Sequence, residues 1–295
     1  MNAKHKPLDE QVIVVTGASS GIGLATALLA CERGATVVLI ARSETVLREV
    51  NADIAAQGGR ADLICADVAD RAAVEQAAAT CVQRHGRIDS WVNNAGVAIF
   101  GRLEEVSEED NRRLFDTNFW GVVNGSLAAL PHLRASGGAL INVGSEVSDA
   151  VLPLQGMYSA SKHAVKGFTD ALRVEVEQVE EAPVSVTLIQ PTAVNTPYPQ
   201  HARNYMDREP KLPDPQIDPF QVAEAILEAA TDGGRDYKVG AMAKMNTSMA
   251  KLLPKIADRF SARQAGRQQQ EASPRQPQGA LYRASNDGRV HGHRP

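Results

Sequence analysis

The stretch that decides the fold is VIVVTGASSGIG, at residues 12–23. It opens with a short run of β-branched residues, which is typical of a strand buried in a parallel sheet. The turn TGASSGIG follows directly and leads into an expected helix over residues 21–33. Glycines let the backbone approach a pyrophosphate closely, and a helix N-terminus stabilises its negative charge. A glycine-rich turn alone is a weak signal, but its place between a strand and a helix indicates dinucleotide binding.

Strand and helix patterns continue to alternate over about 240 residues. Further strands are expected at residues 36–40, 61–66, 88–92, 139–143, 184–189 and 236–239, and further helices at 71–85, 107–133 with a break, 158–179 and 219–230. The sequence therefore predicts an α/β fold: a single Rossmann-type, doubly wound parallel sheet with helices on both faces, spanning residues 1–240. Such sheets bind ligands at the carboxyl ends of their strands.

Composition narrows the functional class. The chain has 295 residues, 43% of them hydrophobic and 22% charged, and a net charge of -4, which gives no reason to expect nucleic-acid binding. We expect no signal peptide, because residues 1–10 are polar, and no membrane span, because no apolar run reaches about 20 residues. Cys31, Cys65 and Cys81 lack CxxC spacing, which favours reduced thiols in a cytoplasmic enzyme over disulfides or a metal site.

Three segments fall outside the regular alternation. Residues 191–218 are rich in proline and polar side chains, and their length suggests a lid over the substrate. Residues 241–260 are expected to form an amphipathic helix with interleaved basic residues; it packs on the body or on a second subunit, or alternatively contacts a membrane surface peripherally together with the tail. Residues 261–295 hold six arginines against Glu271 and Asp287, a formal charge of +4, and their composition predicts a disordered tail.

Tyr158 and Lys162 are four residues apart, so a helix would place the phenol and the ammonium on one face. A free tyrosine titrates near ~10, and a nearby cation lowers that pKa. Ser145, upstream in VGS, could hold a substrate oxygen while the proton moves. The pattern predicts a proton-transfer site.

The end of the second expected strand indicates which cofactor is used. An acidic residue there would bind the adenosine ribose and favour NAD. The sequence LIARS has Arg42 instead and no carboxylate, which favours NADP through charge-assisted bonds to a 2′-phosphate. Asp67 and Val68 follow the third strand, where they would touch the adenine, and NNAG at residues 93–96 follows the next strand, where it would support the cofactor.

Together, TGASSGIG, NNAG, Ser145 and YSASK at residues 158–162 strongly resemble the short-chain dehydrogenase/reductase family over about residues 10–240. The resemblance implies a tetrad in which Tyr158 is the general acid or base, Lys162 lowers its pKa and binds the nicotinamide ribose, Ser145 binds the substrate carbonyl, and Asn118 holds a relay water. The cofactor-binding residues expected are Gly17, Ser19, Ser20, Gly21, Ile22, Gly23, Arg42, Asp67, Val68, Asn94, Ala95, Gly96, Tyr158, Lys162, Pro191, Val194 and Thr196.

The sequence departs from the family pattern where Pro191-Gly would be usual, because Thr192 stands in the glycine's place. The leading hypothesis is an NADP(H)-dependent carbonyl reductase or alcohol dehydrogenase; the alternatives are an NAD-dependent alcohol dehydrogenase and a non-catalytic NADP(H)-binding regulator. The resemblance also implies a homodimer or homotetramer. The substrate pocket is expected to be lined by Glu146, Val147, Ser148, Leu152, Pro153, Leu154 and the 191–218 segment, with Tyr198, His201, Tyr205 and Met206 as its lid.

Overall fold

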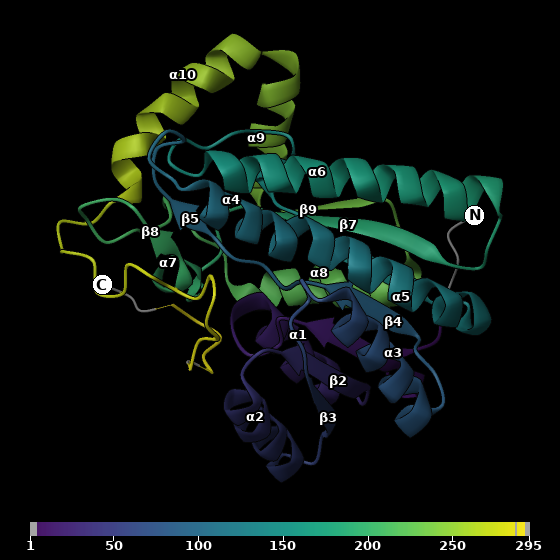
Figure 1. Cartoon of the computed structure of the whole chain (residues 1–295). Helices are drawn as coiled ribbons and strands as arrows, with labels where there is room; N and C mark the ends of the chain where they lie inside the picture. Colours follow the sequence, from purple (N-terminus) through teal and green to yellow (C-terminus); the bar gives the residue numbers. More distant parts are fainter. Residues whose placement is uncertain (1–4, 287, 293–295) are drawn as a thin grey trace.

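A seven-stranded, entirely parallel sheet lies at the centre of the molecule (Figure 1). The structure is a computed structural model that describes residues 5–286 and 288–292, so Asp287 and Arg294 of the basic tail lie outside the described residues. The strand order is β3-β2-β1-β4-β6-β7-β9. The strands are β1 (Val12–Thr16), β2 (Thr36–Ala41), β3 (Arg60–Cys65), β4 (Ser90–Asn93), β6 (Ala139–Val143), β7 (Ser185–Pro191) and β9 (Asp236–Val239). The doubly wound sheet predicted from the sequence is confirmed.

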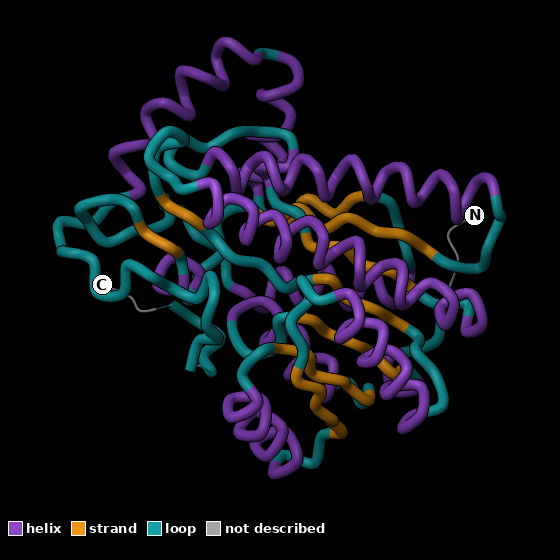
Figure 2. Tube along the Cα trace, viewed as in Figure 1, coloured by secondary structure: helices purple, strands orange, loops and turns teal. Residues whose placement is uncertain are grey.

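Helices cover both faces of this sheet (Figure 2). One apolar core joins the sheet to α1 (Gly21–Glu32), α2 (Glu44–Ala56) and α8 (Pro219–Asp232). A second core joins the opposite face to α3 (Arg71–His85), α5 (Gly121–Ser136) and α6 (Gly156–Arg173), while α4 (Glu108–Phe115) precedes α5. The five central strands are buried on both faces, so their side chains contribute to both cores, whereas the edge strands β3 and β9 are only partly buried.

Short polar side chains and glycines fix the ends of these helices. Ser43, Asp70 and Ser107 each accept a hydrogen bond from the backbone N–H three residues later, which caps α2, α3 and α4. Gly86 and Gly137 end α3 and α5 in the left-handed conformation that only glycine adopts readily. The helices run back to the amino edge of the sheet, where the next strand begins. The loops that follow the strands therefore collect at the carboxyl edge.

Three features of the body differ from the sequence expectations. Helix α2 was not expected between the second and third strands, although Ser43 caps it. The expected break after α4 is a π-helical turn, Asp116–Trp120, and a second such turn, Val174–Val179, extends α6. A small two-stranded parallel sheet, β5 (Ile99–Phe100) and β8 (Arg203–Asn204), ties the 191–218 segment to the body beside the short helix α7 (Tyr198–His201).

The expected single helix at residues 241–260 is two helices, α9 (Ala241–Leu252) and α10 (Pro254–Gln264), which stand beyond the sheet at one end of the molecule (Figure 1). The break falls at Leu253, because Pro254 cannot continue a helix as an interior residue but is favoured at the start of one. Among the residues that the structure describes, no helix is long and apolar enough to cross a membrane.

The tail lies against the body, which differs from the disorder that its composition predicts. A 3₁₀ turn, Ala265–Gln268, follows α10, and Gln268 is fully buried. Leu281 is also fully buried, in a cluster with Val97, Ile99 and Leu114. The composition is mostly polar, but these few anchors and several backbone hydrogen bonds hold the tail in place.

Candidate active site

The glycine-rich turn after β1 has a conformation that requires its glycines. Gly17 and Gly21 have φ angles of +66° and +56°, in the left-handed region. A Cβ on Gly23 would lie 2.3 Å from the Gly17 carbonyl oxygen. Asn94, after β4, donates from its side-chain amide to the carbonyls of Thr16 (2.9 Å) and Gly17 (3.3 Å). The turn is therefore held open at the N-terminus of α1.

One cavity of about 320 Å³ runs along the carboxyl edge of the sheet. It brings together nearly all the expected site residues, namely Gly17, Ser19, Ser20, Gly21, Ile22, Arg42, Asp67, Val68, Asn94, Ala95, Gly96, Ser145, Tyr158, Lys162, Pro191, Val194 and Thr196. Gly23 and Asn118 do not line it. Gly23 packs behind the turn, and Asn118 is fully buried behind the wall.

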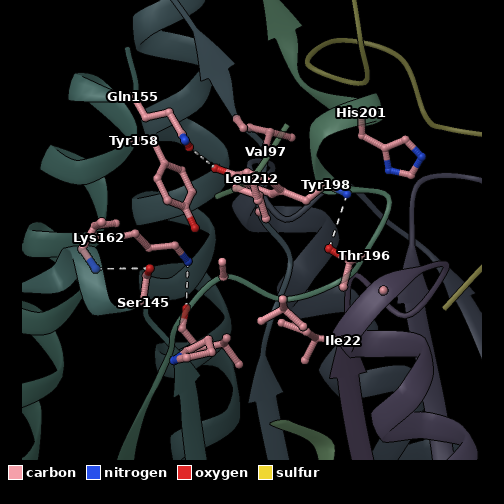
Figure 3. Close-up of a pocket in the computed structure, with 18 of the residues that line it drawn as sticks. Ile22, Val97, Ser145, Gln155, Tyr158, Lys162, Thr196, Tyr198, His201 and Leu212 are labelled. Atoms are coloured by element: carbon pink, nitrogen blue, oxygen red, sulfur yellow. Dashed lines mark hydrogen bonds between the residues drawn. The ribbon is translucent and has the colours of Figure 1, made fainter. Parts of the chain in front are cut away.

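Helix α6 places Tyr158 and Lys162 on the face that borders this cavity, and Ser145 reaches it from the end of β6 (Figure 3). The Lys162 Nζ lies 5.8 Å from the centroid of the Tyr158 ring and donates to the Val143 carbonyl (2.8 Å). The Tyr158 phenol is within hydrogen-bonding reach of Ser145. The helical spacing thus brings the three side chains to one place.

Burial governs the protonation of these groups. Desolvation raises the pKa of Tyr158 to about 12, and hydrogen bonds with Tyr198 and Ser145 only partly offset it. Desolvation also lowers the pKa of Lys162 to about 8. The groups that shift the pKa of Tyr158 are Tyr198, Ser145 and Glu146 besides its burial, so the expectation that Lys162 lowers this pKa stays a prediction.

Asn118 is fixed by the π-helical turn between α4 and α5. Its Nδ2 donates to the Val97 carbonyl (3.0 Å) and to the Ser161 hydroxyl (3.2 Å), and its Oδ1 accepts from the Val97 N–H (2.8 Å). A Cβ on Gly96 would lie 3.5 Å from the Asn118 Oδ1 and 4.0 Å from the Lys162 Nζ. The amide and the ammonium therefore flank the same glycine. A π-turn at this point is in keeping with the use of such turns at functional sites.

A second phenol, Tyr198, stands in the site. Its ring packs edge-on against that of Tyr158, with centroids 5.4 Å apart, and its hydroxyl donates to the Gln155 Oε1 (2.8 Å; Figure 3). Gln155 in turn donates to the Gln268 Oε1 (2.7 Å), and Gln268 to the Pro153 carbonyl (2.7 Å). This buried chain of hydrogen bonds links the catalytic region to the C-terminal extension. Sequence reasoning missed both glutamines, because nothing local distinguishes them from surface glutamines.

The expected substrate pocket is partly reproduced. Glu146, Val147, Leu152, Tyr198 and His201 line the cavity, whereas Ser148, Pro153, Leu154, Tyr205 and Met206 do not. The Ser148 hydroxyl accepts from the Ser145 N–H (3.2 Å), and the Tyr205 hydroxyl donates to the Asp110 carboxylate (2.7 Å). Both side chains are thus committed to structural contacts. The C-terminal helices supply residues to the cavity that were not expected there, among them Met242, Asn246, Met249 and Phe260.

Arg42 lies at the end of β2 as expected, and the tail covers it. Its guanidinium donates to the backbone carbonyls of Ala280 (2.5 Å), Leu281 (3.2 Å) and Arg283 (3.3 Å). Near the glycine-rich turn, the Gly21 N–H donates to the Arg289 carbonyl (2.9 Å). The tail carbonyls therefore occupy donors at the end of the cavity that Arg42 and Gly21 line.

Asp67, at the end of β3, pairs with Arg113 (2.5 Å) beside the same cavity. Burial lowers the pKa of Arg42, and the nearby Asp67 carboxylate only partly offsets this effect. Within residues 5–286 and 288–292, no group of three His, Cys, Asp or Glu side chains gathers to hold a metal ion.

Comparison with known proteins agrees with this arrangement. A family model described as short chain dehydrogenase matches residues 11–207. An uncharacterized oxidoreductase, YxnA of Bacillus subtilis, is 44% identical over 286 residues, which cover 95% of this chain and 80% of the relative. The solved structure of a short chain dehydrogenase/reductase from Burkholderia phymatum in complex with NAD has a TM-score of 0.74 at 25% identity, covering 84% of this chain and 96% of that one.

A second solved structure is that of an alcohol dehydrogenase from the archaeon Thermococcus sibiricus complexed with 5-hydroxy-NADP. It has a TM-score of 0.67 at 29% identity and covers 78% of this chain and 94% of that one. The family match covers most of the chain. The relative covers 95% of it, and the two solved structures cover 84% and 78%. The chain belongs to the short-chain dehydrogenase/reductase family of oxidoreductases.

Proposed function

We propose that the protein is an NADP(H)-dependent oxidoreductase that transfers a hydride between the nicotinamide and a carbonyl or secondary alcohol, with Tyr158 as general acid or base. The observation that carries this proposal is the meeting of Ser145, Tyr158 and Lys162 in a cavity continuous with the glycine-rich turn. A phenol, a hydroxyl and an ammonium at one place supply the proton donor, the oxygen ligand and the positive charge that carbonyl reduction requires.

The residues present fit a nicotinamide dinucleotide. The cavity extends from Arg42 past the N-terminus of α1 to Lys162, and the glycines of the turn leave backbone N–H groups for a pyrophosphate. When bound, the cofactor supplies or accepts the hydride. Pro191, Val194 and Thr196 would support the nicotinamide, since Thr196 packs directly on Gly21 at that wall.

The protein's own part is to hold and move the proton. Since burial holds the pKa of Tyr158 near 12, the phenol of the free enzyme is protonated at neutral pH, as a general acid for carbonyl reduction must be. Ser145 would bind the substrate oxygen, Lys162 the ribose hydroxyls, and Asn118 a water beside Gly96 that leads protons toward Lys162. The Tyr198 phenol, whose pKa burial also raises, would stay neutral and hydrogen-bond with the Tyr158 phenol.

The first test follows NADPH oxidation with a panel of ketones and aldehydes. We expect Tyr158→Phe to lose at least about 100-fold in kcat, which is the usual contribution of a positioned acid. Full turnover by this variant on any substrate would refute the assignment of Tyr158. Tight NADPH binding without turnover on a broad panel would favour the alternative of a non-catalytic regulator.

The preference for NADP(H) over NAD(H) rests on Arg42 and on the absence of a carboxylate at the end of β2. We expect Arg42→Ala to raise the KM for NADPH at least about tenfold, because a charge-assisted pair with the 2′-phosphate is lost, and to leave the KM for NADH nearly unchanged. Arg48→Ala is the matched control, since Arg48 is an exposed arginine that pairs with Glu44 on α2. Equal changes for both cofactors would refute the 2′-phosphate role of Arg42.

We further propose a cytoplasmic homo-oligomer. Trp120, Leu127, Val174 and Val179 are large exposed apolar residues on the helical segments that begin near Ser107 and Tyr158, where the family resemblance places subunit contacts. Light scattering of Trp120→Glu should show a smaller assembly than that of the wild type. Peripheral membrane contact remains a prediction for the bend between α9 and α10, where Leu252, Leu253 and Ile256 are exposed.

A further inference from the structure

The substrate end of the cavity is mostly apolar. Leu152 borders it beside the catalytic serine loop, Leu212 comes from the 191–218 segment, and α9 and α10 close it with Met242, Met249 and Phe260. A surface of this kind favours a substrate with a sizeable apolar body.

The carboxylate of Glu146 interrupts this apolar surface, one residue after the catalytic Ser145. It accepts a hydrogen bond from the Asn246 Nδ2 (2.9 Å) and another from the Thr192 side chain, both of them neutral donors. Thr192 stands where the family pattern has glycine, so the hydroxyl is a feature of this sequence. Among the residues that the structure describes, no lysine, arginine or histidine forms an ion pair with Glu146. Burial raises the pKa of Glu146 accordingly.

Two further acceptors lie at the same end without partners. The side-chain oxygens of Asn246, on α9, and Gln264, on α10, are buried, and neither has a hydrogen-bond partner within the described part of the chain. The orientation of the Asn246 amide is fixed, because turning it over would place its oxygen against the Glu146 carboxylate. The buried side-chain atoms without partners at this end are therefore oxygens, which can only accept hydrogen bonds.

The Glu146 carboxylate and the two unpaired amide oxygens destabilise the fold when no ligand donates to them. A buried acceptor left without a donor has lost its hydrogen bond to water, and a buried carboxylate without a cation costs more. A ligand that brings a donor recovers part of this cost, whereas a purely apolar ligand seals the acceptors off from water. Discrimination built on such hydrogen bonds can be large, because the analogue that lacks the donor leaves the acceptors unpaired.

We propose that the substrate is an apolar ketone, or the corresponding secondary alcohol, that carries a hydroxyl or ammonium donor close to the reacting carbon, and that Glu146 and Asn246 bind this donor. The proposal rests on the oxidoreductase function proposed above. Proximity to the reacting carbon follows from the position of Glu146, which comes directly after Ser145 and lines the same cavity as Tyr158.

The experiment compares three alcohols of one chain length, octan-2-ol, octane-1,2-diol and 1-aminooctan-2-ol, as substrates with NADP⁺. We expect the wild type to give kcat/KM values for the diol or the amino alcohol at least tenfold above that for octan-2-ol. Glu146→Gln should bring the ratio of the diol or amino-alcohol kcat/KM to the octan-2-ol kcat/KM down to about one, and this ratio is the readout because Glu146 also acts on the pKa of Tyr158. A loss confined to the amino alcohol identifies an ammonium ligand, and similar losses for the diol and the amino alcohol identify a hydroxyl-type contact.

Two controls separate a binding role from a structural one. Glu175→Gln alters an exposed carboxylate far from the cavity and should leave all three values unchanged. If Glu146→Gln unfolds, Asn246→Leu tests the same proposal from α9, and it should show the same selective loss while circular dichroism shows that the protein is folded.

The outcomes also distinguish this proposal from the proposed function. Equal kcat/KM for all three alcohols, a uniform loss in Glu146→Gln, or turnover of none of them by an enzyme that reduces other carbonyls would overturn the donor site alone. A protein that oxidises no NADPH with any carbonyl would overturn the proposed function itself.

Discussion

Lys162 is only 4% exposed, and its buried ammonium donates a hydrogen bond to the Val143 carbonyl. Burial lowers its pKa from 10.5 to about 8. The unfolded chain therefore binds a proton between pH 8 and 10.5 that the folded chain does not, so stability rises with pH across that window. Below pH 8 the folded protein carries the full cost, which is on the order of 3 kcal/mol from the conversion of pKa differences to free energy.

We expect Lys162→Met to abolish turnover and yet to stabilise the fold at pH 7. The gain should be about 2 kcal/mol, since the relieved cost is partly offset by the lost hydrogen bond to Val143. Thermal unfolding at a series of pH values measures it, and the gain should shrink as the pH approaches 10.5. Lys166→Met, one turn along α6, removes a partly exposed lysine paired with Asp170 and should show no such pH-dependent gain. A destabilised Lys162→Met at pH 7 would contradict this account.

Residues with local signatures could be predicted, and residues defined by distant partners could not. Tyr158, Lys162 and the glycines of the turn owe their positions to helical spacing and to a strand-turn-helix unit, both of which are readable in the sequence. Asn246 reaches Glu146 across 100 residues of chain, and Gln268 reaches Gln155 across 113. No periodicity or motif reports contacts of that kind.

Helices and strands that have a local sequence pattern could likewise be predicted, and those without one could not. The strands were predictable because burial on both faces selects continuous apolar runs. Helix α2 was not predicted, although Val46, Leu47, Val50 and Ile54 follow helical spacing, because polar and charged residues are interleaved with them throughout. The paired strands β5 and β8 are two residues each, too short for any pattern to appear.

The Tyr198–Gln155–Gln268 chain couples the turn Ala265–Gln268 to the start of α6, and this coupling can be tested. We expect Gln268→Leu to lower the free energy of unfolding by about 1–3 kcal/mol, because it leaves the buried Gln155 amide without its acceptor. It should also lower kcat/KM by releasing Tyr198 from its position beside Tyr158. Gln57→Leu, at an exposed glutamine that ends α2, is the control. Unchanged stability and activity in Gln268→Leu would show that the extension is not coupled to the site.

At the scale of the whole molecule, the tail crosses from the Tyr158 end of the cavity, where Gln268 lies, to the Arg42 end. The Arg289 carbonyl occupies the Gly21 N–H, and three other tail carbonyls occupy Arg42. These are donors that cofactor phosphates would use. Composition predicted disorder because it reports the average polarity of a segment, whereas a few buried anchors such as Leu281 decide whether the segment docks.

We therefore expect the tail to compete with the cofactor. A truncation that removes residues 283–295 keeps the Leu281 anchor but frees the Gly21 N–H, and it should raise the association rate of NADPH about tenfold and tighten its binding. Stopped-flow fluorescence of NADPH measures both. Removal of residues 293–295 alone is the matched control, and it should leave both values unchanged. Weaker binding by the longer truncation would mean instead that the tail completes the cofactor site.

Linkage provides an independent test in the full-length chain. If the tail and the cofactor exclude one another, each must weaken the binding of the other by the same factor. Saturating NADPH should then release the tail and speed tryptic cleavage after Arg283 and Arg289, whereas a tail that closes over bound cofactor would be protected. Leu281→Ala should speed the same cleavage without cofactor, since it deletes the buried anchor. Cleavage slowed by NADPH in the wild type would reject competition and establish the tail as a cover.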